Sequence, residues 1–248
     1  ASLAADVILL EKDLTVVADG VVEGRKTYAN MMKYIKITAS SNFGNVLSVL
    51  AASAFLPFLP MRAVQLVLLN LVYDLSCTAM PWDNVDASSL EKPSAWDGKS
   101  VTRFMVRFGS ISSLFDILTY VLLFFVVCPA ICGAQYAAIT DDALKMQFIA
   151  LFQTGWFVES VFTQTLVIYM LRSAHLPFGK YRASAPVIAL TLCGIAFLTA
   201  VPFTFGEAIG LCPLPLVYFG MLAGIVLAYM LSATLVKKLY VRRYKALL

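Results

Sequence analysis

The chain has 248 residues, of which 60% are hydrophobic and only 14% are charged, and its mean hydropathy is +0.81. Soluble domains are about 45–50% apolar and about 25% charged, so this composition excludes an ordinary water-soluble globule and a disordered tail. A formal net charge of +4 is too small to indicate a nucleic acid as a partner, and five cysteines are too few for a disulfide scaffold.

The first 36 residues are the most polar part of the chain. Within them, Ala5–Asp13 is a short apolar run bounded by charges, which predicts a buried strand. From Leu14 to Lys36 apolar residues recur every three or four positions, and no proline separates this segment from the apolar stretch that follows. We therefore expect one long helix that begins in water and enters a membrane. A strand and one helix cannot bury a core alone, so residues 1–36 predict a domain whose remainder lies upstream.

Six mostly apolar stretches follow, each close to the length of about 20 residues that a helix needs to cross a bilayer. Polar segments or segments rich in Pro and Gly separate them. The sequence therefore predicts an all-α polytopic membrane protein, with six transmembrane helices in residues 37–248. The six stretches are Ile37–Pro57, Ala63–Met80, Phe108–Cys128, Phe148–Leu171, Ala183–Pro202 and Leu214–Val236.

Lysine and arginine are distributed unevenly over the segments between these stretches. Seventeen of them lie in the N-terminal segment, the second and fourth loops and the C-terminal tail, whereas only Arg62 and Lys145 lie elsewhere. Because cytoplasmic segments are enriched in positive charge, both termini are predicted to be cytoplasmic. The basic tail predicts contact with membrane lipids, in particular anionic ones.

Polar residues inside the first two stretches indicate a binding site. Asp74 is costly in a bilayer unless it faces protein or water, and Asn70 lies one helical turn before it on the same face. Asn42 and Asn45 share a face of the first stretch. At a rise of 1.5 Å per residue, Asn45 lies roughly 18 Å from the turn between the two stretches. By the same rise Asp74 lies roughly 17 Å from the start of its own stretch, so both are near the middle of a membrane of about 30 Å.

Only five residues, Pro57–Met61, join these two stretches, which predicts a tight hairpin that brings three amides and one carboxylate together. Such oxygen ligands suit a hard cation, for example Mg²⁺, Ca²⁺, Na⁺ or K⁺. The plainer interpretation is that each asparagine only forms an interhelical hydrogen bond, worth about 0.6 kcal/mol on average. For Asn42 alone the two interpretations have equal weight, but the four residues together favour a cation site.

Two further acids and three cysteines leave alternatives open. Glu159 in the fourth stretch either completes the cation site or pairs with a polar neighbour such as Gln164. Asp116 has serine and threonine hydroxyls close by in sequence, which favours a structural role. A soft-metal site is disfavoured, whereas an external disulfide is open if the compartment is oxidising. The cysteines concerned are Cys128, Cys132 and Cys212.

In chain order, several segments resemble those of P-type ATPases. The stretch that ends in YANMMKYIK looks like the end of the α/β phosphorylation domain and the stalk helix after it. SSNFGNV and NLVYD resemble the fifth and sixth membrane helices, which bind the transported ion, and PWDNVD resembles the loop after them. FGSISSLFDILTY and GWFVESVFTQTLV look most like the bacterial magnesium-transporting branch.

The resemblance implies that the six stretches are the last six of ten membrane helices, preceded by a small strand–helix remnant of a cytoplasmic domain. Where calcium pumps have a carboxylate and a small hydroxyl residue, this chain has Asn45 and Tyr73. Fewer charged ligands are compatible with Mg²⁺, which keeps several of its waters. The ligand positions that the family implies fall on Asn42, Asn45, Asn70, Tyr73, Asp74 and Glu159.

The function implied is that of the membrane part of an ATP-driven Mg²⁺ importer in a bacterial inner membrane, working by alternating access. Mg²⁺ would be the transported ion and would also accompany ATP in the complete protein. The phosphorylated Asp-Lys-Thr-Gly motif and the nucleotide site are not in this chain, so we expect the chain alone to be inactive and its partner to be the rest of the polypeptide. The alternatives are a pump for Ca²⁺, Na⁺, K⁺ or H⁺, a self-contained channel or carrier, and a scaffold that does not transport.

Overall fold

The structure is a computed structural model that describes residues 8, 13–91, 93–177, 179–244 and 247. In this part of the chain all regular secondary structure is helical, and short 3₁₀ turns and one π-helical turn lie between the α-helices. The predicted strand Ala5–Asp13 falls almost entirely outside the described residues. The α-helices are α1 (Thr15–Phe55), α2 (Ala63–Cys77), α3 (Gly98–Leu122), α4 (Cys128–Cys132), α5 (Asp142–Leu171), α6 (Ala185–Ala200) and α7 (Leu216–Tyr244).

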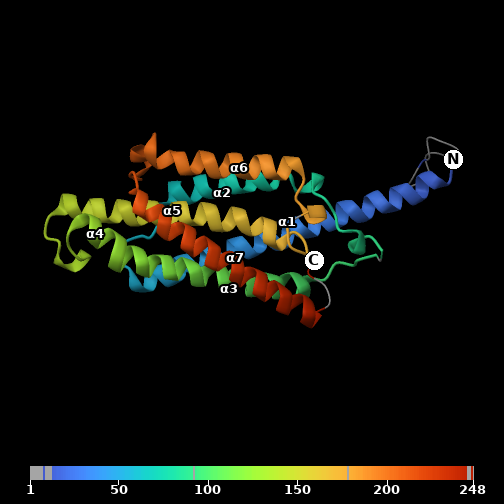
Figure 1. Cartoon of the computed structure of the whole chain (residues 1–248), viewed down its shortest axis with the longest axis horizontal. Coiled ribbons are helices and arrows are strands. Elements are labelled where there is room, and N and C mark those ends of the chain that lie inside the picture. The colour runs from blue at the N-terminus through green and yellow to red at the C-terminus, as the bar shows by residue number, and fades with distance from the viewer. Residues whose placement is uncertain (1–7, 9–12, 92, 178, 245–246, 248) are drawn as a thin grey trace.

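Helix α1 is continuous over 41 residues, and its first half extends away from the bundle (Figure 1). The Asp13 carboxylate accepts a hydrogen bond from the backbone N–H of Thr15 at 2.8 Å, which satisfies one of the free donors at the start of the helix. The helix ends at Phe55 because Leu56, which precedes a proline, adopts an extended conformation. The prediction of one long helix from the polar segment into the first apolar stretch is confirmed.

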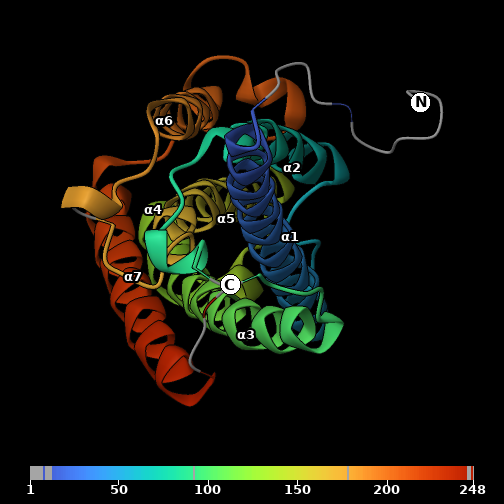
Figure 2. The ribbon, with the colours of Figure 1, turned by 90° about the vertical axis from the view of Figure 1, so that its right-hand side faces the viewer.

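Helix α5 occupies the centre of the bundle (Figures 1 and 2). It packs against each of the other α-helices, and residues 151–161 are all buried. Around it, α1 packs mainly on α3, and α2 packs mainly on α6. The polar side chains in the middle of α5 therefore face protein.

Four helical segments in the described residues are long and apolar enough to cross a membrane, and they coincide with four of the six predicted spans. The other two predicted spans lie within α1 and α5, which are long enough but too polar to meet the same criterion. An all-helical chain with four candidate spans is thus observed. The four are Ala63–Trp82, Gly98–Cys132, Ala185–Phe203 and Leu216–Tyr244.

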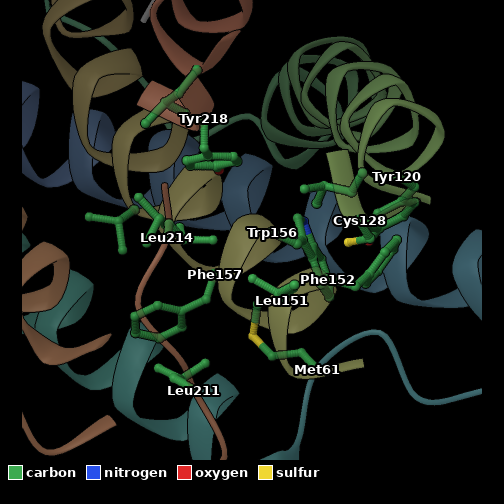
Figure 3. Packing of buried hydrophobic residues seen from close by; sticks show 14 of the residues in the cluster. Met61, Tyr120, Cys128, Leu151, Phe152, Trp156, Phe157, Leu211, Leu214 and Tyr218 are labelled. Carbon is green, nitrogen blue, oxygen red and sulfur yellow. The ribbon is translucent and has the colours of Figure 1, made fainter. Parts of the chain in front are cut away.

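Aromatic side chains of α3 and α5 pack against one another along one face of α5 (Figure 3). The rings of Tyr120 and Trp156 meet edge to face with centroids 4.9 Å apart, and Tyr120 stacks on Phe152 at 5.7 Å. Trp156 is 1% exposed and lies three residues before Glu159. These ring contacts therefore restrict the rotation of α5 about its axis close to Glu159.

Helices α1 and α3 approach each other closely at two glycines. A Cβ atom added to Gly109 would lie 2.7 Å from the carbonyl oxygen of Ser40 and 2.8 Å from the ring of Phe43. A Cβ atom added to Gly44 would lie 3.0 Å from the carbonyl oxygen of Gly109. The contact between the two helices therefore depends on the absence of side chains at these two positions.

Candidate functional site

Helix α1 presents its two asparagines in different environments. Asn42 is exposed on the surface of the chain, whereas Asn45 is half-buried. The side-chain amide of Gln164 on α5 donates a hydrogen bond to Asn45 Oδ1 at 2.6 Å. In the described part of the chain, no donor reaches Gln164 Oε1 and no acceptor reaches Asn45 Nδ2. The hydrogen bond between Gln164 and Asn45 thus connects α5 with α1, and in that part of the chain the amide oxygen of Gln164 remains a free acceptor.

Helix α2 presents Asn70 half-buried and Asp74 exposed, with Tyr73 buried between them. Asn70 Oδ1 has no partner among the described residues. Helix α1 packs mainly on α3, whereas α2 packs mainly on α6 and α5, so the two helices of the predicted hairpin make few direct contacts. The structure therefore does not bring Asp74 or Asn42 into hydrogen-bond contact with the other candidates.

The most buried part of the candidate site is a pair of acids between α3 and α5. Glu159 is 0% exposed and Asp116 is 3% exposed, and their carboxyl groups interact. Asp116 accepts hydrogen bonds from Ser48 Oγ on α1 at 2.5 Å and from Trp156 Nε1 on α5 at 3.1 Å. Neither carboxyl oxygen of Glu159 receives a hydrogen bond from the described residues. Two ionised carboxylates this close in a dry interior repel each other, so the pair favours a proton or a cation between them.

The prediction that Asp116 forms hydrogen bonds with hydroxyl groups close to it in sequence is wrong. Its two hydrogen bonds come from Ser48 and Trp156, which lie 68 and 40 residues away in the chain, and not from hydroxyls on its own helix. The expected alternative that Glu159 pairs with Gln164 is also not realised, because Gln164 donates to Asn45. Asp116 and Glu159 thus form one polar contact between α3 and α5, and Gln164 with Asn45 forms another between α5 and α1.

These two contacts contain only oxygen and nitrogen side chains, and their acceptors without a donor in the described part of the chain are the carboxyl oxygens of Glu159 and the amide oxygen of Gln164. Such a donor set suits a hard cation, which binds carboxylate and amide oxygens. Among the described residues, no three His, Cys, Asp or Glu side chains are grouped closely enough to hold a metal ion. All five cysteines are free, so the external disulfide is not present in the structure.

The prediction of the site omitted Asp116, although the sequence contained a signal for it. An acid within a predicted span is a functional candidate whatever its neighbours are, and that rule applies to Asp116 as much as to Asp74. The contribution of Gln164 had no comparable signal, since a glutamine in a span commonly forms only an interhelical hydrogen bond.

Comparison with known proteins places the sequence of this chain in a family. A family model described as "Cation transporting ATPase, C-terminus" matches residues 58–239. The chain is 46% identical over 242 residues to a magnesium-transporting ATPase, P-type 1, of Salmonella typhimurium, and 48% identical to the protein of that name in Escherichia coli K12. Each match covers 97% of this chain and 25% of the relative.

A more distant match is a calcium-transporting ATPase 2, endoplasmic reticulum-type, of Arabidopsis thaliana, which is 34% identical over 91 residues and covers 36% of this chain. The chain thus spans about a quarter of the length of the magnesium-transporting relatives. The family model covers well over half of the chain, and the resemblance to P-type ATPases is confirmed. The chain belongs to the family of C-terminal membrane regions of cation-transporting P-type ATPases.

Proposed function

We propose that the chain is the ion-translocating part of an ATP-driven Mg²⁺ importer that works by alternating access. The observation that carries the proposal is the buried acid pair, Glu159 and Asp116, in which neither carboxyl oxygen of Glu159 has a donor among the described residues. The magnesium-transporting relatives supply the identity of the ion, which the donor set alone leaves open among hard cations. In this proposal the metal ligands are Asn42, Asn45, Asn70, Asp74 and Glu159, joined by Asp116 and Gln164.

The exposed part of the site fits a contact with the remainder of the polypeptide. Asp74 and Asn42 lie on the outer surface of α2 and α1, at a depth where a charge facing lipid would be costly. The relatives contain about three times as much additional chain. We assign the covering of this surface, and the completion of the cation site, to the missing membrane helices.

The six-span arrangement is part of the same proposal. Helices α1 and α5 are less apolar than the four candidate spans, yet the polar residues of α5 are buried in protein, so they do not prevent it from crossing a membrane. With six spans, seventeen of the nineteen basic residues lie on one side, which supports the proposal that both termini are in the cytoplasm of a bacterial cell. Residues 1–36 are then the end of the phosphorylation domain and the stalk, and residues 37–248 are the membrane domain.

ATP chemistry belongs to the part of the polypeptide outside this chain. The continuous helix α1 connects the cytoplasmic side with Asn45, and a movement of its first half would therefore reach the site. We expect the chain alone to hydrolyse no ATP.

Membrane lipids are a further proposed partner. At the cytoplasmic ends of α3 and α7, the guanidinium groups of Arg103 and Arg107 lie 4.8 and 5.4 Å from the centre of the Tyr244 ring. Arg107 also donates a hydrogen bond to the Tyr244 hydroxyl at 3.2 Å. This ordered pair of exposed cations favours the headgroups of anionic lipids.

The test is Asp74→Asn in the full-length protein that contains this chain. We expect loss of Mg²⁺ uptake and of the ATPase activity that free Mg²⁺ stimulates at constant Mg·ATP, because the neutral amide removes the charge that attracts the ion. The control is Glu207→Gln, which neutralises an exposed carboxylate in the loop before α7 and should leave both activities unchanged. Unchanged uptake in Asp74→Asn, or stimulation by Ca²⁺ and not by Mg²⁺ in the unmodified protein, would contradict the proposal.

A further inference from the structure

A single carboxylate in the loop between α2 and α3 is buried against two cations from different helices. Asp83 is fully buried, and its Oδ2 atom lies 2.9 Å from Lys33 Nζ on α1 and 2.8 Å from Arg172 Nε at the end of α5. Lys33 and Arg172 are themselves 3% and 1% exposed. We call these three residues the Asp83 cluster.

Each of the other nitrogen atoms of the two cations also donates a hydrogen bond, as Lys33 Nζ does to further acceptors. Lys33 Nζ donates to Asn30 Oδ1 at 2.9 Å and to the carbonyl oxygen of Asn84 at 2.6 Å. Arg172 donates to that same carbonyl at 3.0 Å and to the carbonyl oxygen of Tyr181 at 2.6 Å. The cluster thus connects α1, the loop after α2 and the loop that leads to α6.

The same two helices are connected a second time, at the candidate cation site. Lys33 lies twelve residues before Asn45 on α1, and Arg172 lies eight residues after Gln164 on α5. At 1.5 Å per residue these separations are about 18 and about 12 Å. One connection therefore joins the middle of α1 to the C-terminal end of α5, and the other, Gln164 to Asn45, is at the proposed ion ligands.

Stability alone explains the Asp83 cluster poorly. Removing ions from water costs several kcal/mol each, and apolar residues of similar size often replace a buried ion pair with no loss of stability. Burial also lowers the pKa of Lys33 from its ordinary value, although Asp83 opposes this shift, so the desolvation cost is present here. In some proteins a buried ionic group instead fixes the geometry between particular atoms, and that is the role considered for this cluster.

We infer that Asp83 is a positioning residue for ion transport, which holds α1 and α5 in one register so that a displacement of α1 reaches Gln164 and Glu159. This inference rests on the proposed function. When the first half of α1 moves, the Asp83 cluster obliges the end of α5 to move with it. Without the cluster, α1 would slide past α5, and the ligands on the two helices would lose their common geometry.

Two variants of the full-length protein each remove one arm of the cluster and leave one balanced ion pair. Lys33→Met keeps Asp83 with Arg172, and Arg172→Met keeps Asp83 with Lys33. We expect each variant to weaken Mg²⁺ binding, measured by calorimetry without nucleotide, by at least about fivefold, the lower end of measured couplings between sites. The triple variant Lys33→Met/Asp83→Leu/Arg172→Met should unfold near the wild-type temperature and bind Mg²⁺ no more weakly than the single variants.

The control is Asp97→Asn on the same loop, where an exposed carboxylate pairs with Arg103 at 3.4 Å and caps α3. Asparagine is an equally good cap, so Mg²⁺ binding should not change. The inference is overturned if the single variants lower the unfolding temperature but bind Mg²⁺ normally, or if their binding defects add in the triple variant. Failure of the proposed function would look different, because the unmodified protein itself would then show no Mg²⁺ binding.

Discussion

At the scale of single residues, the chemistry of the chain depends on where its few acids find partners. Asp116 accepts hydrogen bonds from two donors, Ser48 Oγ and Trp156 Nε1. Glu159 is equally buried but has no donor in the described residues. The two carboxyl groups are therefore not equivalent, and Glu159 is the one that a cation or a proton must satisfy.

Glu159→Gln tests this difference. Without Mg²⁺ the variant should unfold at a higher temperature than the wild type, because its amide can donate to Asp116 and gain about 1 kcal/mol, the net value of an ordinary hydrogen bond. Mg²⁺ should stabilise the wild type and not the variant, since a ligand raises stability only when it binds the folded state. Thermal unfolding of the full-length protein in detergent, with and without Mg²⁺, measures both effects. A variant that Mg²⁺ still stabilises to the wild-type extent would remove Glu159 from the site.

The sequence identified the residues with unusual chemistry but not their partners. Asp74, Asn45 and Glu159 stand out because polar groups are rare in apolar helices, and that inference needs no fold. The partners of Asp116 and Asp83 could not be predicted, since they lie 40 to 89 residues away and become neighbours only when α1, α3 and α5 pack. Asp83 in particular occurs in a segment with the composition of an exposed loop, and only the structure shows that it is fully buried.

At the scale of elements, helices α1 and α3 approach each other backbone to backbone at Gly44 and Gly109. Gly109→Ala would place a methyl group 2.7 Å from a backbone oxygen of α1, which cannot move aside as a flexible side chain can. We expect the helices to separate and the free energy of unfolding to fall by about 1–3 kcal/mol, the usual cost of overpacking. Gly220→Ala on α7 is the control, because nothing lies within 4 Å of its added Cβ and alanine is the better helix former. Equal unfolding temperatures for the two variants would contradict a tight contact.

The sequence predicted some features of the helices and not others. Periodicity and the absence of proline predicted α1 as one helix, and Leu56 before Pro57 marked its end. Apolar composition predicted the helices that face outward, such as α7. The central position of α5 was not predicted, because a helix surrounded by protein on all sides lacks the contrast between two faces on which periodicity depends.

At the scale of the whole molecule, the number of spans decides on which side each loop lies. If α1 and α5 both cross the membrane, the loop between α2 and α3 is cytoplasmic and the loop between α4 and α5 is external. If only the four apolar segments cross, the two loops exchange sides while the N-terminus stays in place. The two arrangements therefore make opposite predictions for the same pair of loops.

Single cysteines in a background without the five native ones distinguish the two arrangements. Ser94 and Thr140 are exposed residues in the two loops, and replacing either by cysteine changes side-chain size little. With six spans, a maleimide that does not cross membranes should label Thr140→Cys in intact cells, and should label Ser94→Cys only after the inner membrane is opened. Mg²⁺ uptake by both variants is the control for correct folding. The reverse labelling pattern would establish four spans. The loop that carries Asp83 would then lie on the opposite side of the membrane from the phosphorylation domain, and the inference that Asp83 couples the two would be wrong.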